Sequence, residues 1–153
     1  MSLHSEIREE INEAARQRQR EKLTVLRSII AEFTNEAIKI GHDRSEDLPD
    51  DKAQDVISRL VKQRRDSIDQ FESAGRTDLA DAEKNELSIL EKYLPQQMSQ
   101  AEIEEYLKKK IQEMGIKDRS ELGNLMSTTM KELKGQADGK LVKETAEKVI
   151  TDI

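Results

Sequence analysis

Apolar residues recur every three or four positions along almost the whole chain, and this periodicity constrains the fold more than any other feature of the sequence. Such spacing places side chains on one face of an α-helix. Only two prolines and six glycines interrupt the 153 residues, too few for the many turns of a sheet-rich fold. The pattern therefore predicts an all-α protein whose amphipathic helices pack their apolar faces together.

The first part of the chain is expected to form four helices, including a long helical hairpin. The apolar stripes predict helices over about residues 5–18, 23–40, 51–74 and 77–94. No breaker separates the first two helices, so a single continuous helix is the alternative. Gly41 and Gly75 are the expected helix ends, and Thr77 is the expected N-cap of the fourth helix.

Pro95 breaks the helical pattern and marks the expected boundary between two domains, residues 1–95 and 96–153. The second domain is expected to be a bundle of three shorter helices. Residues 99–102 (Ser-Gln-Ala-Glu) form a capping box at the start of its first helix. Residues 118–121 (Asp-Arg-Ser-Glu) resemble a second capping box. The predicted architecture is a four-helix part followed by a three-helix bundle.

The composition excludes several classes of function. The chain has no cysteine, which removes disulfides, thiolate catalysis and cysteine-based zinc sites. Its two histidines, His4 and His42, have no histidine partner at helical spacing, and we expect both to be exposed to solvent. There is no Gly-rich phosphate loop, no nucleophile motif and no long apolar segment. We therefore expect a cytoplasmic protein without metal, cofactor or membrane span.

Two charged residues fall within the apolar stripes of the expected hairpin. A rotation of about 100° per residue places Arg64 in the apolar face of the third helix and Glu83 in that of the fourth. Because the two helices run antiparallel, we expect Arg64 and Glu83 to form a structural ion pair, with Glu86 as a further partner. Two alternatives stay open: the stripe faces solvent at this point, or Arg64 anchors a substrate.

A basic cluster lies near the C-terminus of a chain whose net charge is −6. Residues 96–153 carry 10 Lys and Arg against 11 Asp and Glu, a net of −1. The candidate nucleic-acid-binding residues here are Lys131, Lys134, Gly135, Gly139, Lys140 and Lys143. A helix that begins at Gly139 adds amide donors that suit a phosphate. Since no aromatic residue lies nearby, such a contact would follow the backbone charge and not the bases. Ordinary surface lysines are the alternative.

Two stretches of the sequence resemble the YqeY-like proteins, and the resemblance covers essentially the whole chain. The first is KQRRDSIDQFESAGRTDLA, which starts at Lys62 and leads on to LEKYLP at residues 90–95. The second comprises LGNLM at 122–126, then Met130 and Lys131, then KGQADGKLV at 134–142. The positions that match the family pattern in this second stretch are Gly123, Met126, Met130, Lys131, Gly135, Ala137, Asp138, Gly139, Lys140 and Val142.

The resemblance implies that residues 96–153 are similar to the tail domain of the B subunit of the tRNA-dependent amidotransferase (GatB). That enzyme amidates misacylated Glu-tRNA or Asp-tRNA with glutamine as the amido-nitrogen donor, and its tail domain approaches the tRNA. The catalytic domain of that subunit has no counterpart here, so a carbon–nitrogen ligase role follows only by association. Asn124 and Gln136 depart from the family pattern, which commonly has a basic residue at both positions, and each departure removes positive charge.

Three functions therefore compete. The first is a non-catalytic helical binding module that contacts tRNA, or a tRNA-bound enzyme, through residues 122–143. The second is a protein–protein interaction adaptor without a nucleic-acid role, with the four-helix part docking the partner. The third is an enzyme, such as a stand-alone carbon–nitrogen ligase or hydrolase, for which the residues themselves give no support.

Overall fold

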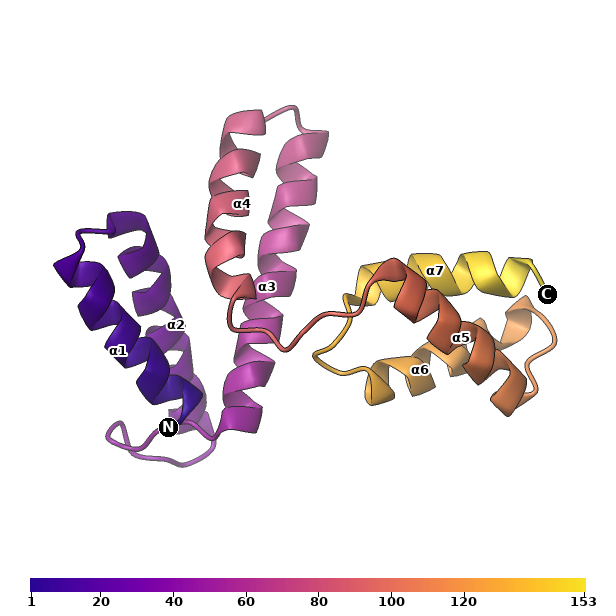
Figure 1. Cartoon of the computed structure of the whole chain (residues 1–153), viewed down its shortest axis with the longest axis horizontal. Helices are drawn as coiled ribbons and strands as arrows, with labels where there is room; N and C mark the ends of the chain where they lie inside the picture. Colours follow the sequence, from indigo (N-terminus) through magenta and orange to yellow (C-terminus); the bar gives the residue numbers. More distant parts are fainter. The chain divides into compact units, whose positions relative to one another are not determined.

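The computed structural model describes all 153 residues as seven α-helices and one short 3-10 turn, without strands (Figure 1). The prediction of an all-α fold is confirmed. The chain forms two compact units, Met1–Leu94 and Pro95–Ile153. Each unit buries an apolar core of its own. None of the helices combines the length and the apolar character that a membrane crossing requires.

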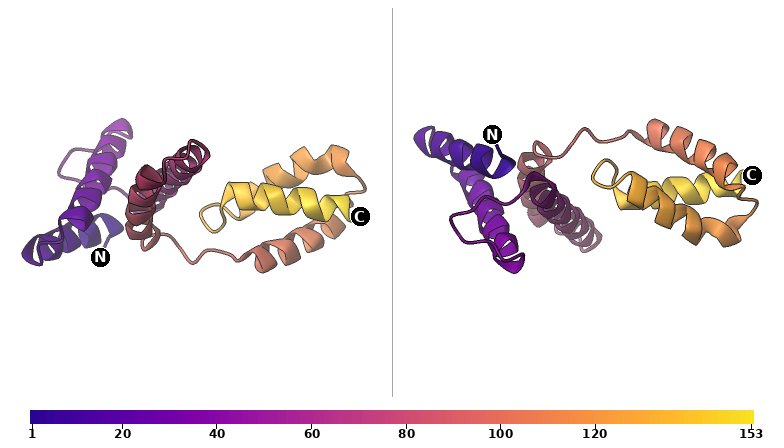
Figure 2. Two further views of the ribbon diagram at one scale, coloured as in Figure 1. Left: turned by 90° about the horizontal axis from the view of Figure 1, so that it is seen from above. Right: turned by 90° about the horizontal axis from the view of Figure 1, so that it is seen from below.

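The first unit consists of two helical hairpins, each made of two helices that lie side by side (Figures 1 and 2). Its helices are α1 (Leu3–Arg16), α2 (Arg20–Lys39), α3 (Asp50–Ser73) and α4 (Thr77–Glu91). The apolar stripes meet in a core whose largest fully buried side chains include Ile7, Leu26, Phe33, Ile57 and Leu90. Full burial of such side chains stabilises the unit by roughly 1.5–3 kcal/mol each relative to exposure.

The helices α1 and α2 are separate, which decides against one continuous helix. The α1 helix ends in a Schellman turn: the Gln19 N–H donates to the Ala14 carbonyl at 2.9 Å, and the Arg18 N–H donates to the Ala15 carbonyl at 3.2 Å. Arg18 itself has a φ of 56°, in the left-handed region. Because one left-handed residue reverses the chain, the helix ends without the proline or glycine that the sequence reasoning looked for.

The same turn ends three other helices, and each of these has glycine at the left-handed position. Gly41, Gly75 and Gly115 have φ values of 86°, 72° and 66°. Glycine has no Cβ and adopts this conformation at little steric cost. The predicted helix ends at Gly41 and Gly75 are confirmed. The prediction that Thr77 caps α4 is wrong, because the turn leads directly into the helix and Arg76 occupies the cap position without a side-chain bond.

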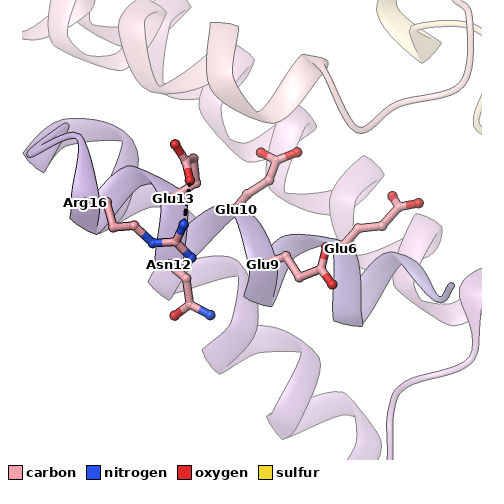
Figure 3. Close-up of a pocket in the computed structure, with 6 residues that line it drawn as sticks. All are labelled: Glu6, Glu9, Glu10, Asn12, Glu13 and Arg16. Carbon is pink, nitrogen blue, oxygen red and sulfur yellow. Dashed lines mark hydrogen bonds and ion pairs between the residues drawn. The ribbon is translucent and has the colours of Figure 1, made fainter.

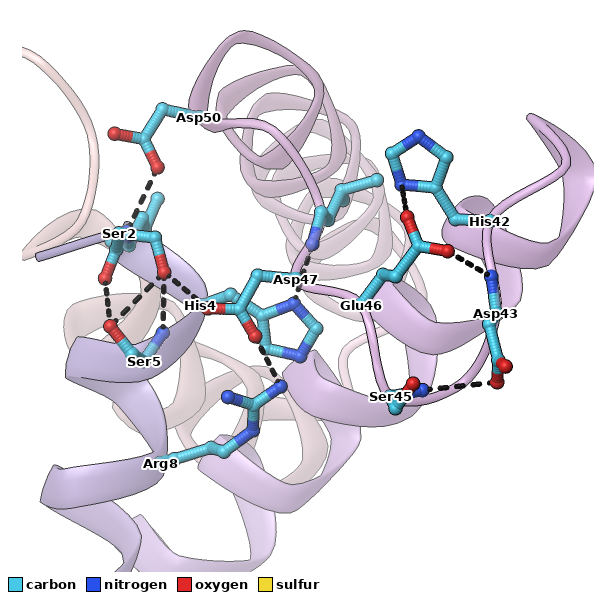
Figure 4. Close-up of polar contacts among 12 residues, drawn as sticks. Ser2, His4, Ser5, Arg8, His42, Asp43, Ser45, Glu46, Asp47 and Asp50 are labelled. Atoms are coloured by element: carbon cyan, nitrogen blue, oxygen red, sulfur yellow. Dashed lines mark hydrogen bonds and ion pairs between the residues drawn. The ribbon is translucent and has the colours of Figure 1, made fainter.

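The start of α1 is held by polar contacts to the segment that links α2 to α3 (Figure 4). Ser2 Oγ caps the helix by accepting from the Ser5 N–H at 3.1 Å, and it donates to Asp47 Oδ2 at 2.7 Å. Arg8 Nη2 lies 2.6 Å from the other oxygen of Asp47. The Leu3 N–H donates to Asp50 Oδ1 at 2.9 Å. These bonds fix α1 to residues 39 to 47 positions later in the chain.

His4 is buried at the centre of this network, and the prediction that it is exposed is wrong. Its side chain is 2 % exposed, and its ring meets the ring of Phe33 edge-on at a centroid distance of 5.3 Å. Nδ1 accepts the N–H of Leu48 at 2.9 Å, so the imidazole must be neutral at this nitrogen. The error arose because α1 begins at Leu3, two residues earlier than predicted, which places His4 on the buried face beside Ile7. His42 is half-buried.

The second unit packs three helices, α5 (Gln100–Met114), α6 (Leu122–Glu132) and α7 (Gly139–Thr151), around their apolar stripes (Figure 2). Ser99 Oγ accepts the N–H of Glu102 at 3.2 Å, which confirms Ser99 as the N-cap of α5, and its hydroxyl donates to Glu102 Oε1 at 3.1 Å. Asp118 Oδ1 accepts the N–H of Ser120 at 2.9 Å, but it caps the 3-10 turn Arg119–Glu121 that precedes α6 and not an α-helix.

Replacing Arg18 by glycine should stabilise the first unit. A left-handed conformation costs a residue with a Cβ about 1–2 kcal/mol, and the greater unfolded-state freedom of glycine offsets about half of that. We expect Arg18→Gly to raise the free energy of unfolding by about 0.5–1 kcal/mol in urea titrations. The matched control is Gly41→Ala, which has open space at its Cβ position but a φ of 86° and should destabilise by a similar amount. Equal stability of all three proteins would contradict this account.

Acidification should weaken the first unit through His4. Burial lowers the pKa of His4, with the Arg8 charge adding to this effect and Asp47 opposing it. The unfolded chain therefore takes up a proton near the ordinary histidine value of about 6.5 while the folded chain does not, so stability is full above that pH and falls below it. Urea midpoints measured at pH 7 and pH 5 should show this loss. His4→Asn, whose amide oxygen can accept the Leu48 N–H without titrating, should remove most of the difference.

Candidate functional site

The candidate nucleic-acid contact lies at the turn between α6 and α7. Gly135 has a φ of 77°, and the N–H of Gln136 donates to the carbonyl of Leu133 at 2.9 Å. Asp138 then caps α7 by accepting the N–H of Lys140 at 3.3 Å. Gly139 is the first residue of α7, and a Cβ there would lie 3.5 Å from Met130 Cε, an ordinary contact. The turn is thus closed by one left-handed glycine and one aspartate cap.

The first residues of the second unit hold this turn in place. Gln97 Nε2 donates to the carbonyl of Gly135 at 2.9 Å, and the N–H of Met98 donates to the carbonyl of Gln136 at 2.8 Å. Both acceptors belong to the turn backbone. The sequence did not predict these two hydrogen bonds, because residue spacing carries no information on contacts between positions 38 apart.

All four predicted lysines are exposed at this turn, which we call the lysine turn: Lys131, Lys134, Lys140 and Lys143. The first two flank the end of α6, and the second two lie three residues apart on the first turn of α7. Residues three apart on a helix project from the same side. The structure therefore brings the four ammonium groups to two adjoining helix ends, on either side of one short connection. Gly135 and Gly139 in that connection are half-buried.

The two acidic residues of the lysine turn, Glu132 and Asp138, have different partners. Glu132 Oε1 lies 2.6 Å from Lys110 Nζ, and Tyr106 OH donates to its other oxygen. The bond from Lys110, followed by that from Tyr106, lowers the pKa of Glu132, so it stays ionised and tied to α5. The carboxylate of Asp138 serves the cap of α7. Glu132 is therefore held toward α5, whereas Asp138 lies within the lysine turn as the cap of α7.

A hollow on the first unit lies along the acidic outer face of α1, where four glutamates and one arginine line it (Figure 3). The side chains in Figure 3 point in different directions and do not converge on one point. Glu10 accepts a hydrogen bond from Tyr93 OH, and Glu13 Oε2 pairs with Arg16 Nη1 at 3.2 Å. No group of three His, Cys, Asp or Glu residues is placed to hold a metal ion. This face is a solvated helix surface.

Arg64 and Glu83, which the sequence analysis pairs, lie face to face between α3 and α4. Arg64 Nη1 is 2.9 Å from Glu83 Oε2 and 2.5 Å from Glu86 Oε2. All three side chains are half-buried, with 30 %, 20 % and 29 % of their surfaces exposed. One guanidinium nitrogen is thus shared by two carboxylates from successive turns of α4. The arrangement supports a structural role for Arg64, because two carboxylates of α4 hold its guanidinium group.

Comparison with known proteins gives a family match along nearly the whole chain. A family model described as Yqey-like protein matches residues 4–150. A relative in Saccharomyces cerevisiae strain YJM789, named "Altered inheritance of mitochondria protein 41, mitochondrial", is 28 % identical over 121 residues, which cover 78 % of this chain and 61 % of the relative. Relatives of the same name in Lachancea thermotolerans and Eremothecium gossypii are 34 % and 37 % identical over 53 % and 48 % of this chain, and 43 % and 38 % of their own. The matched part of this chain thus spans less than two thirds of each relative.

Replacing Arg64 by methionine should destabilise the first unit by about 1 kcal/mol, a value discounted for the partial exposure of the site. The cause is that Glu83 and Glu86 would face each other without a cation. The double variant Arg64→Met with Glu83→Gln removes one of the two charges and should recover part of the loss in urea unfolding. No recovery would show that Arg64 acts through the packing of its aliphatic stem and not through charge.

Proposed function

Because this chain belongs to the Yqey-like protein family, we propose that it is a non-catalytic helical binding module that associates with tRNA, or with a tRNA-bound enzyme, through the lysine turn. The family match covers both units, and the lysine turn lies inside it. The names of the relatives state no activity, so the proposal rests on the chemistry of this surface. The similarity to an amidotransferase tail, and with it a link to carbon–nitrogen ligases, belongs to the same proposal.

The observation that carries this proposal is the exposure of four lysines around one short connection between two helices. Glu132 is held by Lys110 and Tyr106, and Asp138 caps α7. A surface of this kind attracts a polyanion although the chain as a whole is acidic, with a net charge of −6. The N-terminus of α7 at Gly139 adds the positive end of a helix dipole to the same region.

The same surface indicates how the RNA is contacted. The lysine turn has no aromatic side chain for base stacking, and Tyr106 on α5 donates its hydroxyl to Glu132. Lysines act as point charges, so they bind phosphates without reading sequence. Asn124 and Gln136 are exposed and neutral, which keeps the charge of the surface low. We therefore expect weak, salt-sensitive binding, with a Kd of about 1 μM or higher.

A protein-interaction adaptor is the second candidate function, and one observation favours it. Ile38 and Ile40, near the end of α2, are 47 % and 39 % exposed, and Leu79 on α4 is 36 % exposed. Large apolar side chains at a surface are available to a protein partner. A protein partner bound through these residues would stay bound after nuclease treatment, whereas a partner bridged by RNA would not. The subcellular compartment of this chain stays a prediction.

The proposal is tested by tRNA filter binding across a salt series, with another polyanion of similar size as competitor. Lys131→Glu combined with Lys140→Glu reverses two charges of the lysine turn and should reduce binding at low salt at least tenfold. The matched control is Lys109→Glu combined with Lys148→Glu, which makes the same change in net charge at two exposed positions outside the turn. The control should keep most of the binding.

Equal loss in the two double variants would mean that only net charge matters, and the lysine turn would then not be the site. ATP- and glutamine-dependent turnover by the purified chain would refute the non-catalytic assignment. Circular dichroism of each variant checks that the helical fold is intact, since all four substituted side chains are exposed.

A further inference from the structure

Three arginines lie at the junction of α1 and α2: Arg16 ends α1, Arg18 lies in the connection, and Arg20 begins α2. Arg16, Arg18 and Arg20, which we call the arginine turn, alternate with two glutamines, and all five side chains are exposed. The first unit, Met1–Leu94, contains 16 Lys and Arg against 21 Asp and Glu, a net of −5. This concentration of positive charge therefore stands out from its own unit.

The charges of the arginine turn are largely unpaired. Five other arginines of this unit form ion pairs with nearby carboxylates: Arg8 with Asp47, Arg59 with Glu32, Arg64 with Glu83, Arg65 with Glu91 and Arg76 with Asp78. Arg27 and Arg44 also form no ion pair, but each of them stands alone in the sequence and not in a cluster of arginines. Arg16 pairs with Glu13 at 3.2 Å, but that pair is exposed and contributes little. Arg18 and Arg20 form no ion pair. Their guanidinium groups are open to an external anion.

Arg18 occupies a position where an arginine is costly. Its φ of 56° places it in the slot that glycine fills after three other helices, at Gly41, Gly75 and Gly115. A side chain at such a position lowers stability by about 1 kcal/mol relative to glycine. A residue kept at a local cost in stability points to a use for that side chain. The charge that Arg18 places at the tip of the hairpin is the evident candidate.

The surroundings of the arginine turn suit phosphate. Arg18 and Arg20 line a surface hollow together with Ala15 and Leu23. The α2 helix begins at Arg20 without a side-chain cap, so its first amide groups add positive potential at the same end. The guanidinium fork matches phosphate oxygens in a bidentate manner. The exposed large apolar side chains of the chain, at positions 1, 38, 40, 79 and 153, all lie outside this turn, which argues against insertion into a membrane.

We propose that the arginine turn is a second RNA-contact surface, which binds the phosphodiester backbone of the same RNA that the lysine turn contacts. This inference takes its partner, RNA, from the proposed function. It does not depend on the lysine turn being an RNA-binding site. Two separate weak surfaces on one chain raise the combined affinity above that of either, provided that both reach the same RNA. Each contributes its own released counterions to the salt dependence of binding.

The test uses the full chain, bulk tRNA as the probe, and the double variant Arg18→Gln with Arg20→Gln. Glutamine keeps a side chain of similar length and keeps the left-handed strain at position 18, so the fold is unchanged. The matched control is Arg27→Gln with Arg44→Gln, which removes the same charge at two exposed arginines of the same unit that also form no ion pair. Filter binding across a salt series measures affinity and the slope of log Kd against log salt.

We expect the arginine-turn variant to weaken tRNA binding about three- to tenfold at low salt and to reduce the salt slope by roughly 1–2, with less than a twofold effect in the control. If the control weakens binding as much as the variant, net charge is the cause and the inference fails. Binding that falls in the lysine variant but stays unchanged in the arginine variant keeps the proposed site and overturns this one. Binding that falls in the arginine variant but stays unchanged in the lysine variant supports the arginine turn as an RNA contact and contradicts the lysine turn as the site. Absence of tRNA binding by the unmodified chain overturns both.

Discussion

Each helix of this protein carries one apolar stripe, and no helix can cover that stripe by itself. Aromatic residues make up only 3 % of the chain, so the cores are assembled from aliphatic side chains that need partners on two or three neighbouring helices. The antiparallel pairs α1–α2 and α3–α4 provide these partners in the first unit, and the three-helix packing of α5, α6 and α7 does so in the second. Every other feature depends on this burial, because it fixes which faces and turns remain for binding.

The helix ends show how much of the fold short-range sequence patterns can predict. The apolar periodicity and the glycines at Gly41 and Gly75 predicted four of the helix boundaries closely, and the Ser99 cap was read from its spacing alone. The sequence did not decide between one continuous helix and two, because Arg18 occupies the left-handed position that glycine usually marks at the end of a helix. His4 was missed because α1 begins two residues earlier than predicted, and because its partner Leu48 lies 44 residues away, a contact that no short-range pattern reports.

The sequence predicted which residues make up the candidate site, but not the contacts that hold the site in place. The four lysines follow from the sequence, since their excess over nearby acids is visible there. The engagement of Glu132 by Lys110, and the brace from Gln97 to Gly135, required the packed structure. These contacts matter because they decide whether a lysine-rich segment has an open positive face or is neutralised within the fold.

The distribution of charge explains how an acidic protein can offer basic surfaces. Many of its carboxylates are used internally: Asp47 fixes the start of α1, Glu83 and Glu86 share Arg64, and Asp138 caps α7. A carboxylate paired with a cation inside the fold cancels less of the field elsewhere on the surface, because the two opposite charges offset each other at a distance. A net charge of −6 is therefore compatible with local positive potential at helix junctions.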